Sequence, residues 1–329
     1  MRHISSPGGP LHKLAEVIPG FKGGDIPTNF FFVASGVIFA LSRQPEESWA
    51  GTKNFWWERL ARLYPLYLVC VLSCAPIGWV GSKGDWIVFI TSGLLELTFM
   101  QGWFSFRYPY WMHVGWFMSS IAFCYLFYPL FAPMVRKMGE FRLNLTMFSC
   151  GLYALVVALY TDHRLGEQDA EIVRRIPLMP LPIFIGGVCL GNLIKRNLTH
   201  NSLITTGILG VGSAVLLIYY TPNGFEKFGA APLFMLVVNC MALSRIPAPA
   251  RFSQLGELGF TMYMIHWPLA FYTLSVLKNI GLTSAAQSLI TGFVIVGTVI
   301  LLSRPIHEKF ERPTQKYLFS LLGLRKFGA

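Results

Sequence analysis

Charged residues are scarce in this chain. Of its 329 residues, 13% are charged and 53% are hydrophobic, whereas soluble globular domains carry about 25% charged residues. The scarcity excludes an ordinary soluble domain. The formal net charge of +11 does not indicate nucleic acid, because the lysines and arginines form short clusters between apolar runs rather than a basic stripe. The sequence predicts an integral membrane protein with no nucleic-acid partner.

Patterns that mark several other kinds of site are also missing. The six cysteines and seven histidines form no CxxC pair and no cluster with metal-ligand spacing, so no metal site is predicted. The chain has no convincing Walker or Rossmann glycine pattern, no G-x-S-x-G nucleophile elbow and no H-x4-D acyltransferase motif. We therefore expect no permanently bound cofactor, and the cysteines are expected to be small apolar residues of helices.

Long apolar runs are abundant and recur to the end of the chain. A membrane span needs about 20 apolar residues. The stretch 86–103 is ambiguous because Glu96 and Gln101 interrupt it, so it spans, re-enters or lies at the interface. With short linkers and no internal repeat, the predicted fold is all-α, a polytopic transmembrane helical bundle of about 9–10 spans in one domain over 1–329. Spans are predicted at about 28–42, 63–80, 114–135, 144–161, 178–194, 203–220, 229–246, 258–277 and 285–303.

The distribution of lysine and arginine orients the second half of the chain. From residue 136 onward, alternate segments carry 13 and five of these residues, and the richer segments are expected to be cytoplasmic. This places the C-terminus in the cytoplasm. The segment 43–62 is cytoplasmic if 86–103 does not cross the membrane and lies on the trans side if it does, and the total charge count is 17 against 10 in both cases.

Six motifs occur in an order that resembles the membrane-bound acyltransferase family 3. The residues that carry the resemblance are FFFVASGVIF (30–39), ERLARLYPLYL (58–68), GWFMSSIAFCYLFYPLF (115–131), MPLPIFIGGVCLG (179–191), LGELGFTMYMIHWPL (255–269) and HEKFERPTQKYL (307–318). Members of that family O-acylate bacterial surface polysaccharides, exopolysaccharides and related glycans.

The resemblance implies an O-acyltransferase, most simply of the O-acetyltransferase type, in the bacterial inner membrane. Acyl-CoA would be its co-substrate, and the acceptor would be a carbohydrate hydroxyl, as in an exopolysaccharide or lipopolysaccharide unit. Membrane lipids would surround it. Three other readings stay open: a transporter or flippase for a lipid-linked glycan, a catalytically inactive accessory protein, and a different multipass acyltransferase built around His266.

The chain departs from the family pattern at three places. The family opens with a helix bearing an arginine about eleven residues before a histidine; His3 falls at the histidine's position, so the chain is N-terminally short relative to the family. The resemblance makes His3 the catalytic histidine. Ile121 stands where the family usually has Glu, and Asn29 stands where an Asp commonly precedes the Phe pair.

Two arginines are the candidate donor-binding residues. Arg59 and Arg62 are three residues apart and would share one helix face. Guanidinium groups offer planar, bidentate donors to phosphate, and coenzyme A is rich in phosphate. Their alternative role is that of ordinary positive-inside anchors.

His266 is a second catalytic candidate. It lies within an apolar run just before Pro268, and an ionisable residue at membrane depth is a default functional hypothesis. Its alternative role is helix packing beside a proline kink. His113 could enter the same cavity as His266. The pair Ser35-Gly36 is expected to permit close helix packing, and a serine nucleophile is the alternative. The other histidines are predicted to lie in loops: His12, His163, His200 and His307.

Overall fold

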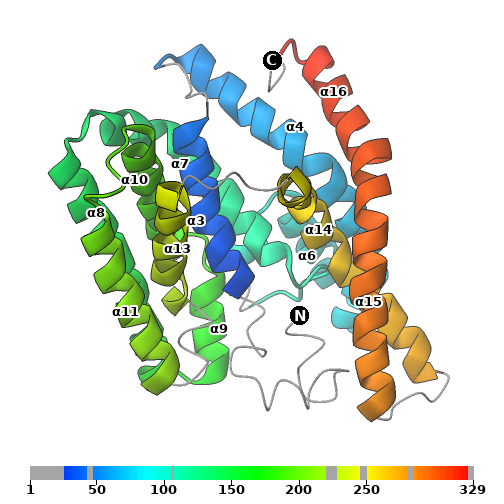
Figure 1. Cartoon of the computed structure of the whole chain (residues 1–329). Helices are drawn as coiled ribbons and strands as arrows, with labels where there is room; N and C mark the ends of the chain where they lie inside the picture. Colours follow the sequence, from blue (N-terminus) through cyan, green and yellow to red (C-terminus); the bar gives the residue numbers. More distant parts are fainter. Residues whose placement is uncertain are drawn as a thin grey trace. The chain divides into compact units, whose positions relative to one another are not determined.

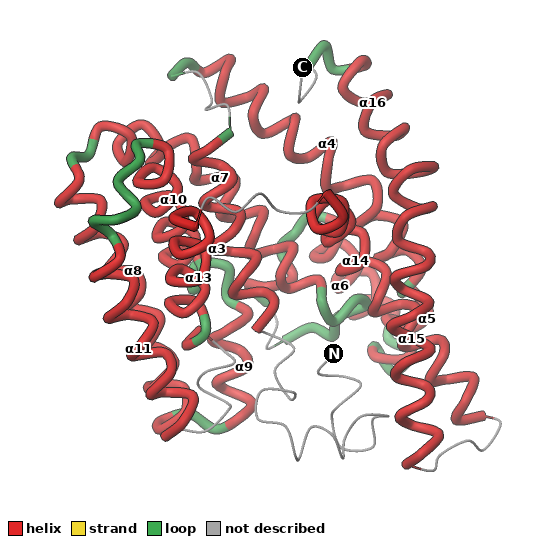
Figure 2. The backbone as a smooth tube through the Cα atoms, in the orientation of Figure 1, coloured by secondary structure: helices red, strands yellow, loops and turns green. Residues whose placement is uncertain are grey.

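The structure, a computed structural model, describes residues 26–42, 47–104, 107–219, 228–244, 250–279 and 285–324. Every regular element within these ranges is a helix (Figure 2), so the predicted all-α fold is confirmed. The chain divides into two compact units, each assembled from separate stretches of sequence. The single domain over 1–329, predicted from short linkers and the lack of an internal repeat, stays a prediction.

The first unit contains residues 14–47 and 120–246. Its helices α3, α10 and α13 pack on one another, and α8 packs beside α11 (Figure 1). The helices are α3 (Ile26–Leu41), most of α7 (Gly115–Lys137), α8 (Glu140–Arg164), α9 (Glu167–Arg175), α10 (Leu181–Lys195), α11 (Leu203–Tyr219) and α13 (Ala231–Ser244).

Glycines allow the backbones of α3 and α10 to touch. A Cβ on Gly36 would lie 2.3 Å from the carbonyl oxygen of Phe184, and a Cβ on Gly187 would lie 2.4 Å from that of Val33. Neither position has room for a side chain. Small residues between membrane helices allow backbones to approach this closely. The packing role predicted for Gly36 is confirmed.

The second unit contains residues 48–119 and 247–329. Ser48 caps its first helix by accepting a hydrogen bond from the backbone N–H of Gly51 at 3.0 Å. The elements are α4 (Trp49–Ser73), α5 (Ala75–Gly81), α6 (Trp86–Leu97), the 3-10 turn η1 (Gln101–Trp103), the start of α7, α14 (Ala250–Asn279), α15 (Ala285–Ile306), the π-helical turn η3 (His307–Glu311) and α16 (Arg312–Leu321).

Among the described residues, helices that are both long and apolar enough to cross a membrane are fewer than the predicted spans. Within the described ranges, α7 and α8 are long and apolar enough to cross a bilayer, and α4 with α5 makes a third candidate that is bent by 52°. The predicted span 63–80 is therefore broken at Cys74, between α4 and α5. Five shorter apolar helices cover 26–41, 86–97, 181–195, 203–216 and 231–244.

The ambiguous stretch 86–103 forms a short helix and a turn. Helix α6 has 12 residues, and at 1.5 Å per residue it is about 18 Å long, too short for a hydrocarbon core of about 30 Å. The two residues that interrupt the apolar stretch point inward: Glu96 is fully buried, and Gln101 donates to the carbonyl oxygen of Gly115 at 2.6 Å. These residues therefore anchor the turn within the unit.

Candidate functional site

Both predicted donor arginines lie near the middle of α4. Arg59 is 7% exposed, and its guanidinium lies over the ring of Phe55, 5.1 Å from the centroid. Arg62, one turn later, is exposed. The helix thus presents one arginine held against an aromatic ring and one that reaches solvent.

An irregular turn between α15 and α16 packs against α4. The backbone N–H of Arg312 bonds to the carbonyl oxygen of His307, five residues earlier, which defines a π turn. Pro313 explains the turn, because its ring has no N–H and clashes with the carbonyl four residues before it. The wider turn brings His307 onto the same side as Glu311 and Arg312.

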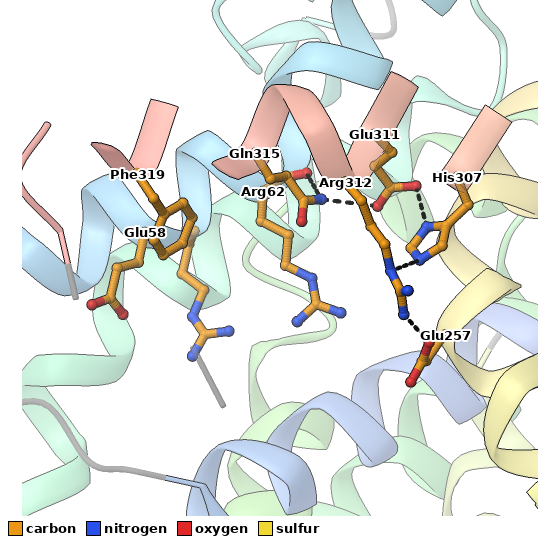
Figure 3. A pocket seen from close by; sticks show the side chains of 9 residues that line it. Glu58, Arg62, Glu257, His307, Glu311, Arg312, Gln315 and Phe319 are labelled. Carbon is orange, nitrogen blue, oxygen red and sulfur yellow. Dashed lines mark hydrogen bonds and ion pairs between the residues drawn. The ribbon is translucent and has the colours of Figure 1, made fainter. Parts of the chain in front are cut away.

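His307, Glu311 and Arg312 are joined side chain to side chain. His307 Nδ1 lies 2.9 Å from Glu311 Oε2, and Arg312 Nε donates to His307 Nε2 at 3.1 Å. The chain of contacts continues from Arg312 Nη2 to Glu257 Oε2 at 2.6 Å. Figure 3 shows these contacts as one line of side chains.

The inner end of this line is anchored by two more polar groups. The Thr261 hydroxyl donates to Glu311 Oε2, and Gln315 Nε2 donates to Glu311 Oε1 at 3.0 Å. Gln315 Nε2 also lies 3.2 Å from the backbone oxygen of Arg62. This last contact ties α16 to α4 directly at the predicted donor arginines.

A pocket of about 220 Å³ lies between these elements. The side chains of Arg62 and Arg312 extend toward it from α4 and α16 (Figure 3). Three arginines and three glutamates give its wall no formal net charge when His307 is neutral. The nine lining residues are Glu58, Arg59, Arg62, Glu257, His307, Glu311, Arg312, Gln315 and Phe319.

The structure brings together only part of the predicted site. Arg59 and Arg62 line the pocket, and His266 does not. His3 lies outside the described residues, so its predicted role stays a prediction. His266 is half-buried in α14, where its Nδ1 is 2.5 Å from the carbonyl oxygen of Tyr263 in the same helix. Its neighbour Trp267 stacks on His113 with ring centroids 5.4 Å apart.

His163 lies in the last turn of α8 and not in a loop, as was predicted. The prediction that His307 is a loop residue is also wrong. It lies in the π turn, is 9% exposed, and contacts a buried carboxylate. The closing motif HEKFERP held the available signal, since a histidine and a glutamate four residues apart share a helix face. The partners Thr261 and Glu257 come from another helix, which spacing along the chain does not reveal.

A second polar cluster surrounds Glu96. Its Oε1 accepts a hydrogen bond from the backbone N–H of Met112 at 3.0 Å, and its backbone oxygen accepts from the Tyr67 hydroxyl at 2.8 Å. Burial raises the pKa of Glu96 to about 8. Glu96 is fully buried, and its contacts connect α6 both to Met112 and to Tyr67 of α4. We therefore assign this cluster a structural role.

Comparison with known proteins places the chain. A family model described as an acyltransferase domain matches residues 25–304. Acyltransferase MdmB from Streptomyces mycarofaciens is 23% identical over 338 residues, which cover 92% of this chain and 83% of that protein. No solved structure matches. Since the family model covers most of the chain, the protein is a member of this acyltransferase family.

Proposed function

We propose that the protein is a membrane O-acyltransferase that moves an acyl group, most simply acetyl, from acyl-CoA to a hydroxyl of a carbohydrate acceptor. The family match supports acyl transfer in general. The observation that carries the choice of donor is the arginine pocket between α4 and α16. Exopolysaccharide or lipopolysaccharide units are the acceptors we propose, and the bacterial inner membrane is the proposed location.

The pocket suits the phosphate-bearing part of the donor. At about 220 Å³ it is smaller than the 300–1,000 Å³ typical of pockets that enclose a whole ligand. It has room for a diphosphate, and guanidinium groups bind phosphate through paired hydrogen bonds. The acyl end of the donor would then extend away from the pocket, toward the acceptor.

The position of the pocket supports donor entry from the cytoplasm. Its walls come from the segment 43–62, from Glu257 and from the C-terminal tail. The tail and the segment containing Glu257 are predicted to be cytoplasmic from their lysine and arginine content. Segments that line one polar pocket share a membrane side, so 43–62 belongs to the cytoplasmic side as well. This requires that 86–103 not cross, which agrees with the short length of α6.

The reaction also requires a base for the acceptor hydroxyl. Removal of the hydroxyl proton lets the oxygen attack the thioester carbonyl, and the CoA sulfur leaves and takes up a proton. We propose His3 for this role from the family pattern, with His266 as the second candidate. The Nδ1 of His266 faces the carbonyl of Tyr263, which leaves Nε2 as the atom able to accept a proton.

Binding of CoA to the purified full-length protein in lipid nanodiscs tests the donor site. We expect wild-type protein to bind CoA, and the double variant Arg59→Ala/Arg62→Ala to lose at least tenfold in affinity, as expected when charge-assisted hydrogen bonds to phosphate are removed. Arg304→Ala is the matched control, because Arg304 is 71% exposed and pairs with Glu308 outside the pocket.

The same variants are tested in cells for acylation of surface glycan. The double variant is expected to reach the membrane at normal levels but to leave the glycan unacylated. Wild-type acylation by the double variant, or equal loss of CoA binding in Arg304→Ala, would contradict the donor site. Transport of a lipid-linked glycan without any acylation would instead favour a flippase.

A further inference from the structure

The contact between Arg312 and His307 defines which ring nitrogen of the histidine carries the proton. Arginine has only donors and keeps its proton in proteins, so Arg312 Nε must donate to His307 Nε2, 3.1 Å away. His307 Nε2 is therefore the accepting nitrogen, and its proton is on Nδ1. That Nδ1–H faces Glu311 Oε2 at 2.9 Å. The imidazole thus links a buried carboxylate to an arginine at the pocket.

The Glu311 side of this link is rigid. Glu311 is 3% exposed and holds contacts from Thr261 and Gln315 as well as from His307. A carboxylate with donors on both oxygens leaves its histidine partner one orientation of the ring. The accepting Nε2 of His307 therefore has a defined direction, toward the stem of the Arg312 guanidinium.

The outer side of Arg312 is held far more weakly. Its Nη2 contacts Glu257 Oε2 at 2.6 Å, but the two side chains are 50% and 55% exposed. Ion pairs between exposed side chains contribute little, typically below about 1 kcal/mol. A phosphate entering the pocket can replace the Glu257 carboxylate at Nη2 while the contact with His307 stays in place.

We propose that Arg312 is a third phosphate-binding arginine of the donor site, that His307 is its positioning residue, and that Glu257 competes with the donor for the same guanidinium. This inference rests on the proposed function, since the phosphate is that of the CoA donor. Of its three residues, His307 and Arg312 lie after residue 304, where the family match ends, and Glu257 lies within the match. It assigns opposite effects on donor binding to His307 and Glu257, which both contact Arg312.

Two conservative replacements of His307 separate positioning from packing. In His307→Gln the side-chain amide reaches the position of Nε2, so its oxygen can still accept from Arg312. In His307→Asn the shorter amide reaches the position of Nδ1, so it keeps a donor for Glu311 but offers Arg312 no acceptor. We expect the Kd of CoA to rise about tenfold in His307→Asn, the effect of one misplaced charge-assisted hydrogen bond, and to rise much less in His307→Gln.

Removal of the competing carboxylate should tighten binding. We expect Glu257→Gln to lower the Kd of CoA several-fold, with no such gain in Glu308→Gln, an exposed glutamate that pairs with Arg304 outside the pocket. If Glu257→Gln tightens CoA binding by releasing Arg312, the double variant Glu257→Gln/Arg312→Ala must bind CoA no more tightly than Arg312→Ala alone.

The outcomes distinguish this inference from the proposed function. Absence of CoA binding by wild-type protein contradicts the proposed function itself. Binding that depends on Arg59 and Arg62 but is equal in His307→Asn and His307→Gln overturns the positioning role alone. Unchanged or weaker binding in Glu257→Gln overturns the competition. If His307→Asn does not accumulate in the membrane, the Glu257 and Arg312 variants decide the result.

Discussion

Arg136 and Glu47 form an ion pair, with Nη2 of the arginine 2.7 Å from Oε1 of the glutamate. Lys137 approaches the other carboxylate oxygen at 3.5 Å. Glu47 lies in the segment 43–62, and Arg136 and Lys137 begin a segment that positive-inside statistics place in the cytoplasm. This contact lies within the first unit, and the pocket lies within the second. Each separately supports the proposal that 43–62 lies on the cytoplasmic side.

The topology can be measured with single cysteines at the two partners. Cys240 is the exposed native cysteine among the six, so it is first replaced by serine. We expect Glu47→Cys and Lys137→Cys to react with a membrane-impermeant maleimide only after the inner membrane is opened. Labelling of Glu47→Cys in intact spheroplasts, with Lys137→Cys protected, would mean that 86–103 crosses the membrane.

The contact of α3 with α10 predicts a strong effect of one methyl group. Gly36→Ala would place a Cβ 2.3 Å from a backbone oxygen, and backbone atoms cannot move aside as a flexible side chain can. We expect a loss of about 1–3 kcal/mol, typical of overpacking, seen as a lower unfolding temperature in detergent. Gly207→Ala is the control: a Cβ there meets nothing within 4 Å, so helix propensity predicts a neutral or slightly stabilising change. Equal unfolding temperatures for both variants would refute the backbone contact.

The raised pKa of Glu96 predicts how stability depends on pH. An acid whose folded-state pKa is about 8, against an ordinary value of 4.5, contributes stability that is complete below about pH 4.5 and is lost as the pH rises through 8. Glu96→Gln keeps an acceptor for the backbone N–H of Met112 and does not titrate. We expect it to fold normally and to lose less stability than the wild type between pH 5 and 8, as measured by thermal unfolding.

The alanine variant at the same position provides the contrast. Glu96→Ala leaves the Met112 N–H buried without its acceptor, which costs about 1–3 kcal/mol. A Glu96→Gln variant as unstable as Glu96→Ala would contradict a protonated Glu96. The same pH profile in wild type and Glu96→Gln would count against it as well.

His266→Ala tests the second catalytic candidate. If Nε2 of His266 takes the hydroxyl proton, glycan acylation should fall by 10²- to 10⁴-fold, the usual contribution of a general base, at normal expression and with unchanged CoA affinity. If expression falls and the specific activity of the remaining protein is normal, the residue packs the helix beside Pro268 and is not the base.

Local patterns predicted a large part of this protein. Gly36 was expected to permit close packing, and Arg59 and Arg62 were expected to share a helix face, because helix geometry fixes neighbours three and four residues apart. His307 was assigned to a loop, because a π turn depends on the strain that Pro313 places on the preceding carbonyl, and local polarity does not report it. Local patterns also did not predict that Glu96 and Gln101 point inward, since both residues interrupt the apolar run in the same way whether or not the run crosses the membrane.

The sequence by itself determined the all-α membrane class and the family, because these follow from composition, apolar run length and the order of short motifs. Only the tertiary structure decided which polar residues share a site. Arg62 and Gln315 are far apart in sequence, and so are Glu257 and Arg312; each pair meets because α4, α14 and α16 pack together. Packing between distant helices depends on the shapes of all their side chains at once, so no single motif encodes it.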